Sequence, residues 1–558
     1  MSRLRSLGTL LPPAIVVVVG VGLATLPYWR TGEADWVADY DELAFYLPVG
    51  ASALRDHPFR LSDPATGGPT YYQSLPAVPG LVAAELSGRG PWRLGLCWRA
   101  VGGVAVALAW YFLLRTRFAP WPAAAAACVL LSDPGVLYGQ LGYVLAKACA
   151  SPVALAESSL TPTAASLPQW RVMNPVLSWP WWLAFLALTA RAVAVPTRGR
   201  VLAAGVACGL LFHVYFYLWT TATVGLLLAA AADRRRWAVY AGALAVALAV
   251  GAPALAASAQ FRRQFGSDWL HRTDKFLLVG RFDELQLPRV SIVLLALVLV
   301  WVWRRGREWR WLAGVAAAGL LLLNQTAVTG LQIENFHWLF AFGPALSLLV
   351  VLATADLVNR APPRVARLGP ATGWALAFAS VVAGGWLYAR AADGLPENRR
   401  IRAAVAEFRQ QVAGLELPSE GAVAGDADFQ YLAAVEYGLR PLAGYTAVLS
   451  PISDAELDER VALNAQLLGE SREQFRARQE DELARQRWGP EARSAGARAA
   501  KLDTRLAAWD SVAADPAAAA GRFGVRVLAR PAGDPVPPAG RWVLRQSGPR
   551  WEVWVRPE

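Results

Sequence analysis

The chain is poor in the residue types that build disulfide frameworks and metal centres. Its 558 residues include only four cysteines, four histidines and two methionines. No CxxC or HxxxH spacing occurs among them, which argues against a zinc site. The cysteines all lie in the apolar part of the chain, where buried thiols are the ordinary expectation: Cys97, Cys128, Cys149 and Cys208.

Charge is also scarce, and lysine most of all. Charged residues make up 17% of the chain, hydrophobic residues 55%, and only three of the 54 basic residues are lysine. The mean hydropathy is +0.32. Charge-free runs of roughly 15–25 residues alternate with short arginine clusters, a pattern typical of helices cut to bilayer thickness. We therefore expect a polytopic α-helical membrane protein.

The positive net charge belongs to the apolar part of the chain. Residues 401–558 contain 20 basic and 22 acidic residues, a balance of −2, so the +12 of the whole chain leaves +14 for residues 1–400. These arginines lie in short loops between apolar runs, as the bias of basic residues toward the cytoplasmic side requires. The charge therefore indicates membrane topology, and nucleic acid is not an expected partner.

The apolar runs predict about eleven transmembrane helices within residues 1–390. The first is an uncleaved helix of the cytoplasmic membrane with Arg3 and Arg5 on the cytoplasmic side, and the long polar loops then fall outside. The expected later spans lie near 97–114, 120–138, 175–192, 237–258, 290–303, 311–323, 338–356 and 369–388, with two short helices in 201–232 that meet at 213–217. The expected outer loops are 29–95, 139–172, 259–289 and 324–337.

Residues 391–558 differ in composition and predict an extracytoplasmic α/β domain. Gly421–Asp426 and Gly524–Arg530 are typical strands, and Trp542–Arg545 with Trp551–Arg556 indicate a closing hairpin. Residues 453–511 predict a long amphipathic helix that begins with a capping box of Ser453 and Glu456. This part contains no GxGxxG loop or other nucleotide motif, and its role is left open.

The first outer loop concentrates carboxylates and aromatic residues. Its residues 34–48 read ADWVADYDELAFYLP, with four carboxylates within eight residues. A carboxylate near a low-dielectric surface has a raised pKa and can act as a general base for a hydroxyl or amine. A solvated acidic loop or a helix cap would leave the same pattern.

The Asp41-Glu42 pair directly after the first span resembles the motif of the GT-C superfamily of membrane glycosyltransferases. Protein O-mannosyltransferases and lipid A aminoarabinose transferases belong to it. Further similar features are the Asp56-His57-Pro58-Phe59 segment, the Pro-rich stretch from Tyr71 to Gly80, the uneven helices and the outer C-terminal domain. The resemblance implies two amphipathic helices in this loop and a sugar donor linked to polyprenyl phosphate.

The resemblance also implies an inverting transfer to a glycan, lipid or protein acceptor outside the cytoplasm. Asp41 would be the catalytic base, Asp39 is its nearest competitor, and Glu42 completes the motif. No organic cofactor is implied. The superfamily includes members with and without a divalent cation, so a cation is left open and no metal ligand is assigned.

A polyprenyl phosphate leaving group needs cations to hold its charge. Basic residues in outer loops run against the usual bias and favour phosphate binding. The candidates for phosphate binding are Lys147, Arg171, Arg263, His271 and Lys275. The last three lie in the 259–289 loop, together with Arg262 and Arg272. Pairs with nearby aspartates such as Asp268 are the structural alternative for each.

Several polar and aromatic residues at helix junctions are candidates for contacts with the sugars. They are Tyr46, Asn174, His213, Tyr215, Gln332, Glu334 and His337. An interfacial aromatic belt, or a hydrogen-bond network between helices, would explain the same residues structurally.

Other functions fit parts of the sequence. A transporter or flippase of lipid-linked sugars would need charges buried mid-span and internal repeats, and neither is evident. A non-catalytic scaffold would leave the acidic loop unexplained. An outer-leaflet polysaccharide polymerase or ligase would use basic residues of the 259–289 loop.

Overall fold

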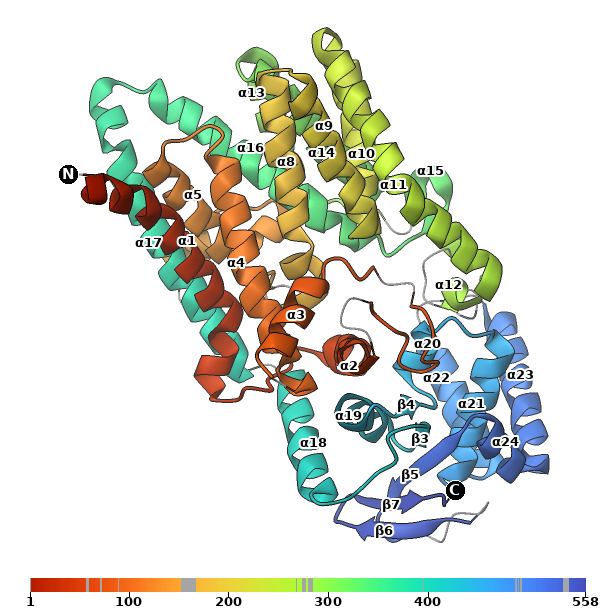
Figure 1. Ribbon diagram of the computed structural model, residues 1–558. Coiled ribbons are helices and arrows are strands. Elements are labelled where there is room, and N and C mark those ends of the chain that lie inside the picture. The colour runs from red at the N-terminus through yellow and green to blue at the C-terminus, as the bar shows by residue number, and fades with distance from the viewer. Residues whose placement is uncertain are drawn as a thin grey trace.

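The computed structural model describes most of the chain. The described residues are all except 1, 57–59, 71–72, 89, 152–166, 267, 273–276, 279–284, 395, 487–488, 490, 492–493, 535–540 and 558. Two parts are visible in Figure 1, a bundle of apolar helices and a smaller domain at its lower end.

Among the described residues, six stretches are long and apolar enough to cross a bilayer by length and composition. They are Leu10–Thr31, Pro91–Leu114, Val172–Ala194, Arg234–Phe265, Asn335–Asn359 and Arg367–Asp393. Their main helices are α1 (Ser2–Thr31), α4 (Leu94–Leu114), α8 (Trp179–Ala194), α11 (Trp237–Phe265), α16 (Leu339–Asn359) and α17 (Pro363–Gly394). Further apolar helices are α5 (Pro120–Ser132), α9 (Arg198–Leu210), α10 (Phe216–Ala232), α13 (Arg289–Arg304) and α14 (Arg310–Leu323). The chain is a multi-pass membrane protein, and the count of about eleven spans stays a prediction.

Small residues let the helices of the bundle approach closely. A side chain at Gly20 of α1 would meet the Gly103 carbonyl of α4 at 2.8 Å, so only glycine allows this crossing. Between α9 and α10 the chain breaks at η6 (Leu211–His213), as the sequence predicts. This break exposes non-helical backbone beside a cavity described below, where such backbone is tolerated.

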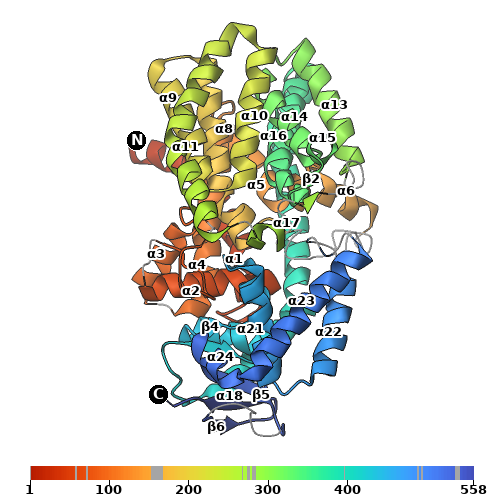
Figure 2. The same cartoon turned by 90° about the vertical axis from the view of Figure 1, so that its right-hand side faces the viewer.

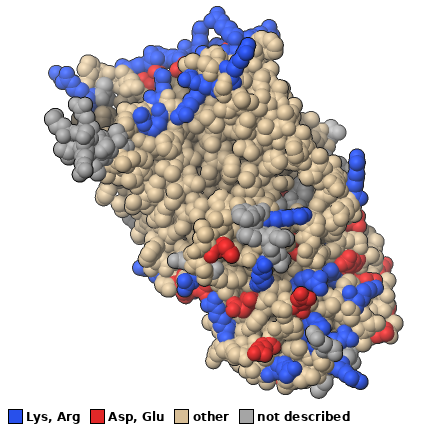
Figure 3. Space-filling model, viewed as in Figure 1, with Lys and Arg blue, Asp and Glu red and all other residues tan. Residues whose placement is uncertain are grey.

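The arginine-rich turns lie together at the end of the bundle farthest from the C-terminal domain. Arg117, after α4, approaches Glu308, after α13, at 3.6 Å, and the Trp301 indole donates to Asp356 at 3.0 Å. Figure 3 shows basic side chains gathered at this end, an almost uncharged belt below it, and mixed charges on the opposite end. This distribution is the one expected of helices that cross a bilayer.

Short elements form a layer between the bundle and the C-terminal domain. From the first outer loop come η1 (Glu42–Tyr46), α2 (Leu47–Asp56), α3 (Val78–Leu86) and η2 (Pro91–Arg93). Later outer segments add η3 (Pro134–Tyr138), α6 (Tyr143–Ala150), η5 (Val172–Leu177), α12 (Asp268–Arg272), α15 (Thr326–Thr329) and η9 (Asn335–Trp338). Antiparallel β1 (Leu277–Leu278) and β2 (Leu331–Gln332) join two outer loops. The resemblance implied two helices in the first loop, and α2 and α3 occupy it.

One outer loop begins later than predicted. The sequence placed its start at residue 259, but α11 continues to Phe265 and ends at Gly266, whose φ is +71°. Alanine-rich sequence favours the helix, and no left-handed residue stops it earlier. Arg262 and Arg263 are therefore helical, on different faces of α11.

The C-terminal domain is α/β, as predicted. Its sheet has the order β4-β3-β5-β7-β6, formed by β3 (Ala422–Ala424), β4 (Arg440–Pro441), β5 (Val525–Pro531), β6 (Val543–Ser547) and β7 (Trp551–Val555). Strands β3, β4 and β5 are parallel, and the last two strands form the expected antiparallel hairpin. Its helices are α18 (Pro396–Val412), α19 (Ala427–Tyr437), α20 (Tyr445–Leu449) and α24 (Pro516–Arg522), together with α21–α23.

The single helix predicted over 453–511 is wrong, because three helices occupy that stretch. They are α21 (Asp454–Leu467), α22 (Arg472–Arg485) and α23 (Ala495–Ala514). Gly469, with φ +84°, ends the first of them, and Ser471 caps the second. Ser453 does accept the Glu456 N–H, but the Glu456 carboxylate bonds Arg460 instead of returning to the cap.

The outer layer and the C-terminal domain share one apolar core. Leu43 and Phe45 of η1 belong to the same buried cluster as Phe408, Phe429 and Trp551 of the domain. Figure 2 shows the domain directly beneath α2 and α3. Continuous burial on this scale fixes the domain against the segment that carries the acidic loop.

Candidate functional site

A buried arginine organises the acidic loop. Arg99, on α4, is fully buried, and its two Nη atoms donate to the Glu42 carboxylate at 2.7 and 2.6 Å. The same guanidinium donates to the Trp170 carbonyl from Nε at 2.9 Å and from Nη2 at 2.6 Å, and to the Tyr28 hydroxyl at 2.8 Å. A side chain at Gly95 would meet Glu42 Oε1 at 2.7 Å, so glycine one turn before Arg99 leaves room for the pair.

Most carboxylates of the loop are engaged by partners. Glu33 pairs with Arg402 at 2.9 Å, and Asp35 pairs with Arg409, both on α18. Asp39 Oδ1 accepts the Glu42 N–H at 2.9 Å and so caps η1. Asp41 is left with its carboxylate facing a cavity, without a hydrogen bond or ion pair to any residue that the structure describes.

The surroundings of Asp41 suit it to accept a proton. Asp41 is exposed to the cavity, but the surrounding protein displaces part of the water around its carboxylate. This desolvation raises its pKa from 3.8 to about 6, and the charges of Asp39, Glu397 and Glu334 act in the same direction. The charge of nearby Arg171 acts in the opposite direction and lowers the pKa of Asp41.

Arg171 supplies a cation on the same cavity. It follows Trp170, whose carbonyl Arg99 holds, and its guanidinium lies 5.3 Å from the ring centre of Phe340 and 5.8 Å from that of Phe336. Burial acts to lower the Arg171 pKa, but Tyr46, Tyr215, Asp39 and Asp41 raise it above its ordinary value. Arg171 therefore stays charged.

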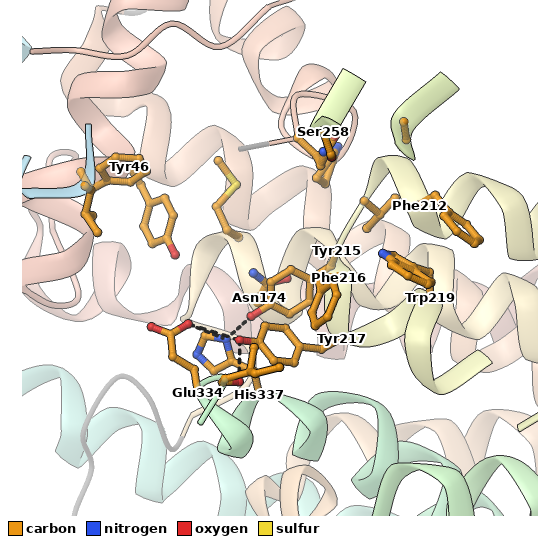
Figure 4. Close-up of a pocket in the computed structure, with 18 of the residues that line it drawn as sticks. Tyr46, Asn174, Phe212, Tyr215, Phe216, Tyr217, Trp219, Ser258, Glu334 and His337 are labelled. Atoms are coloured by element: carbon orange, nitrogen blue, oxygen red, sulfur yellow. Dashed lines mark hydrogen bonds and ion pairs between the residues drawn. The ribbon is translucent and has the colours of Figure 1, made fainter. Parts of the chain in front are cut away.

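The cavity has a volume of about 560 Å³ and brings together seven of the residues singled out in the sequence. These seven are Asp41, Tyr46, Arg171, Asn174, Tyr215, Glu334 and His337. They come from η1, the segment around η5, the break before α10, and the loop before α16. Helix ends from widely separated parts of the chain therefore converge on one space (Figure 4).

One wall of the cavity is a hydrogen-bonded cluster. His337 Nδ1 bonds the Tyr215 hydroxyl and lies 3.7 Å from Glu334 Oε2. The Tyr217 hydroxyl donates to the Ile333 carbonyl at 2.9 Å and reaches Glu334 at 3.4 Å. Glu334 has a φ of +39°, a left-handed backbone that costs energy for a non-glycine residue and is held by these bonds.

The opposite part of the cavity is apolar. Phe212 and Trp219 stack with ring centres 4.3 Å apart at the break between α9 and α10. Leu255 and Ala254 of α11 also line the cavity. In Figure 4 this aromatic end lies on the right, while Tyr46 and Glu334 lie on the left. The cavity thus offers one end to a hydrocarbon chain and the other to polar groups.

Other predicted residues lie away from this lining. Glu42 is held by Arg99, and Asp39 caps η1 beside Asp41. His213 Nε2 contacts the Val250 carbonyl at 3.2 Å. Lys147 lies over the Tyr143 ring at 5.6 Å, and Arg263 and His271 are exposed outside the cavity. Lys275 and the Gln332 side chain lie outside the described residues.

The structure adds lining residues that the sequence did not single out as site residues. Arg262 lines the cavity in place of its neighbour Arg263, and Gln73 joins from the first outer loop. Tyr445 and Leu449 of α20 also line it, so the C-terminal domain forms part of the wall. The helical phase of α11 could have separated Arg262 from Arg263 once the helix was known to reach Phe265. No signal in the sequence marks Tyr445.

The described residues do not offer an evident metal site. Within those ranges, no group of three or more His, Cys, Asp and Glu side chains is placed to hold a metal ion. We therefore assign no step to a divalent cation.

Loss of the Arg99–Glu42 pair should strongly reduce the stability of the folded protein. Arg99→Met leaves the Glu42 carboxylate buried without its partner, which costs about 3–5 kcal/mol of folding free energy. The exposed pair of Arg30 and Asp393, 57% and 49% accessible, is the matched control, and Arg30→Met should cost about 1 kcal/mol or less. Thermal unfolding in detergent measures both.

The double variant Glu42→Leu with Arg99→Met removes both charges. It should recover much of the loss, because neither charge is then left unpaired. Equal thermal stability of Arg99→Met and Arg30→Met would contradict this account of the pair.

Comparison of the sequence with family models and with curated proteins finds no match. Solved structures do match. ArnT from Cupriavidus metallidurans bound to undecaprenyl phosphate aligns at 14% identity with a TM-score of 0.52, over 80% of this chain and 91% of that one. The Archaeoglobus fulgidus oligosaccharyltransferase aligns at 13% identity over 93% of this chain, with a TM-score of 0.40 in its apo form and 0.41 in complex with Zn and sulfate. These alignments cover 69% and 68% of the archaeal chain.

The likeness extends over almost the whole length of ArnT. At this level of identity it establishes the fold. The fold that the sequence resemblance implied is thereby confirmed, and the chain has the GT-C fold.

Proposed function

We propose that the protein transfers a sugar from a polyprenyl-phosphate donor to an acceptor outside the cytoplasm. The observation that carries the proposal is the placement of Asp41 and Arg171 on one cavity whose far end is apolar. The structure of ArnT, which shares the fold, contains undecaprenyl phosphate, and this supports a donor of that chemical class. The nature of the sugar and the acceptor is not part of the proposal.

In the proposed reaction, an acceptor hydroxyl or amine attacks the anomeric carbon from the side opposite the phosphate. The new bond forms as the bond between that carbon and the phosphate oxygen breaks, which inverts the configuration. Asp41 takes the proton from the nucleophile, and a raised pKa of about 6 suits that role. The electron pair of the broken bond leaves with the polyprenyl phosphate.

Arg171 and Arg262 are the proposed partners of the departing phosphate. An arginine presents a fork of N–H donors that matches phosphate oxygens, and Arg171 remains charged beside the carboxylates. The prenyl chain would lie against Phe212, Trp219 and Leu255. The acceptor would then enter from the polar end, past Tyr46 and Tyr445.

The cluster of Tyr215, Glu334 and His337 would contact the donor sugar. Its hydroxyl, carboxylate and imidazole offer both donors and acceptors at the cavity surface. Gln332 stays a predicted contact, as do Lys147, Arg263, His271 and Lys275 for phosphate. A divalent cation also stays a prediction, which loss of activity on EDTA treatment would support.

We further propose the cytoplasmic membrane as the location, with the N-terminus inside and the C-terminal domain outside. The arginine-rich end of the bundle would then face the cytoplasm, as the charge bias of membrane proteins favours. The segments that line the cavity, among them η1, η9 and α20, would then lie on the outer side.

The role of Asp41 is tested by transfer of radiolabelled sugar from a panel of polyprenyl-phosphate sugars in membranes. Asp41→Asn keeps the shape of the side chain and removes the base, so transfer should fall by roughly 10²–10⁴-fold. Asp39→Asn is the matched control and should retain most activity, because asparagine caps a helix as well as aspartate does. If Asp39→Asn abolishes transfer and Asp41→Asn does not, the assignment of the base is reversed.

The absence of transfer by the wild-type protein from every donor, or equal rates for all three proteins, would contradict the proposed function. A flippase or a scaffold would then be the better reading of the fold.

The pH dependence of transfer should reflect Asp41. A base acts only when ionised, so the rate should fall about tenfold for each unit of pH below about 6 and level off above it. Initial rates between pH 4.5 and 8 measure the profile, and size-exclusion chromatography at each pH checks that the protein stays folded. A rate that does not change across pH 6 in folded protein would argue against Asp41 as the base.

A further inference from the structure

A second cavity lies in the C-terminal domain, separate from the one that Asp41 faces. It has a volume of about 550 Å³ and shares no lining residue with the first. Its walls are the start of α21, the end of α24 with the turn before β5, and Arg440 of β4. Nothing in the proposed reaction uses this space.

The three arginines that line this cavity differ in their exposure and in their partners. Arg460 is 9% exposed and donates to Glu456 at 2.7 and 2.9 Å and to the Ala65 carbonyl of the first outer loop at 3.3 Å. Arg522 is exposed and pairs with Glu459 at 2.7 Å. Arg440 is half-buried, and its guanidinium has no hydrogen bond or ion pair among the described residues. A guanidinium without a hydrogen-bond or ion-pair partner in the protein is available to bind an anion.

Phe523 holds two of these arginines in place. The guanidinium carbons of Arg522 and Arg460 lie 4.8 and 5.3 Å from its ring centre. The next residue, Gly524, has a φ of +63°, and a side chain there would lie 3.4 Å from Arg440 Nη2. Glycine at this turn suits the left-handed backbone that lies beside Arg440.

The cavity is not uniformly basic. Glu456, Glu459 and the Ser453 side chain line it together with the three arginines. The two carboxylates would repel a ligand with many negative charges, but they can accept hydrogen bonds from hydroxyl groups. The lining therefore matches a ligand that carries one acidic group among several hydroxyls, which is the chemistry of an acidic sugar.

We propose that this cavity binds an acidic glycan, with the acid group of the sugar on Arg440 and its hydroxyls on Glu459 and Ser453. The cavity adjoins the first outer loop through the contact of Arg460 with Ala65, so it lies beside the segment that leads to α3. The inference rests on the proposed function for its meaning, because a glycan held here would be the acceptor or part of it.

Binding is measured without any donor, on the full-length protein in nanodiscs of phosphatidylcholine. The probe is trigalacturonic acid, with maltotriose as the neutral sugar and inorganic phosphate as the simple anion, each by isothermal titration calorimetry. Trigalacturonic acid should bind saturably and more tightly than either comparison ligand. Arg440→Gln should raise its Kd at least about tenfold, because a charge-assisted hydrogen bond is lost.

Arg545→Gln is the matched control, because it removes the same charge from an exposed position on β6 of the same domain. It should leave the Kd unchanged, and so should Asp41→Asn. Normal binding to Asp41→Asn protein separates this cavity from catalysis, so failure of either proposal can be recognised without the other.

Three results would overturn the inference. They are no saturable binding of trigalacturonic acid, equal binding of maltotriose or phosphate, and equal loss of affinity in Arg440→Gln and Arg545→Gln. Thermal unfolding of each variant shows whether a loss of binding reflects a loss of folding.

Discussion

The candidate site depends on one buried guanidinium. Arg99 has no access to water, and a buried charge without partners is costly, so the fold must satisfy its N–H groups. It does so with Glu42, which follows Asp41, and with the carbonyl of Trp170, which precedes Arg171. A single side chain of α4 thereby fixes the segment that carries the proposed base relative to the one that carries the proposed phosphate ligand.

The C-terminal domain is the second constraint on the same segment. The Tyr40 hydroxyl donates to Asp428 at 3.0 Å, and the Thr446 hydroxyl donates to the Ala44 carbonyl within η1. Arg272 of α12 donates to the Ser450 and Ile452 carbonyls at 3.1 and 2.9 Å, which ties α20 to the outer layer from the other side. Because α20 lines the cavity that Asp41 faces, the domain is part of the candidate site as well as a neighbour of it.

Patterns within one element were the predictable part of this protein. Apolar runs located the helices, arginine clusters located one end of the bundle, and the strand at Gly524–Arg530 appears as β5. Seven predicted site residues also converge, because polar side chains at helix ends on one side of a membrane have few places to lie.

Contacts between distant segments could not be predicted from such patterns. The sequence could not show that Glu42 is held in an ion pair while Asp41 faces the cavity, because the partner of Glu42 is Arg99, 57 residues away. Tyr445 lines the cavity only because α20 docks against it. Arg262 lines it in place of Arg263 because of the helical phase of α11.

The central claim is that the cavity holds a polyprenyl phosphate with its charge beside Asp41. A cryo-electron microscopy structure of the protein in nanodiscs with undecaprenyl phosphate tests it most directly. The account predicts phosphate density within hydrogen-bond distance of Arg171 or Arg262, with the prenyl chain along Phe212 and Trp219. Lipid phosphate bound at another part of the protein, with this cavity empty at saturating lipid, would contradict it.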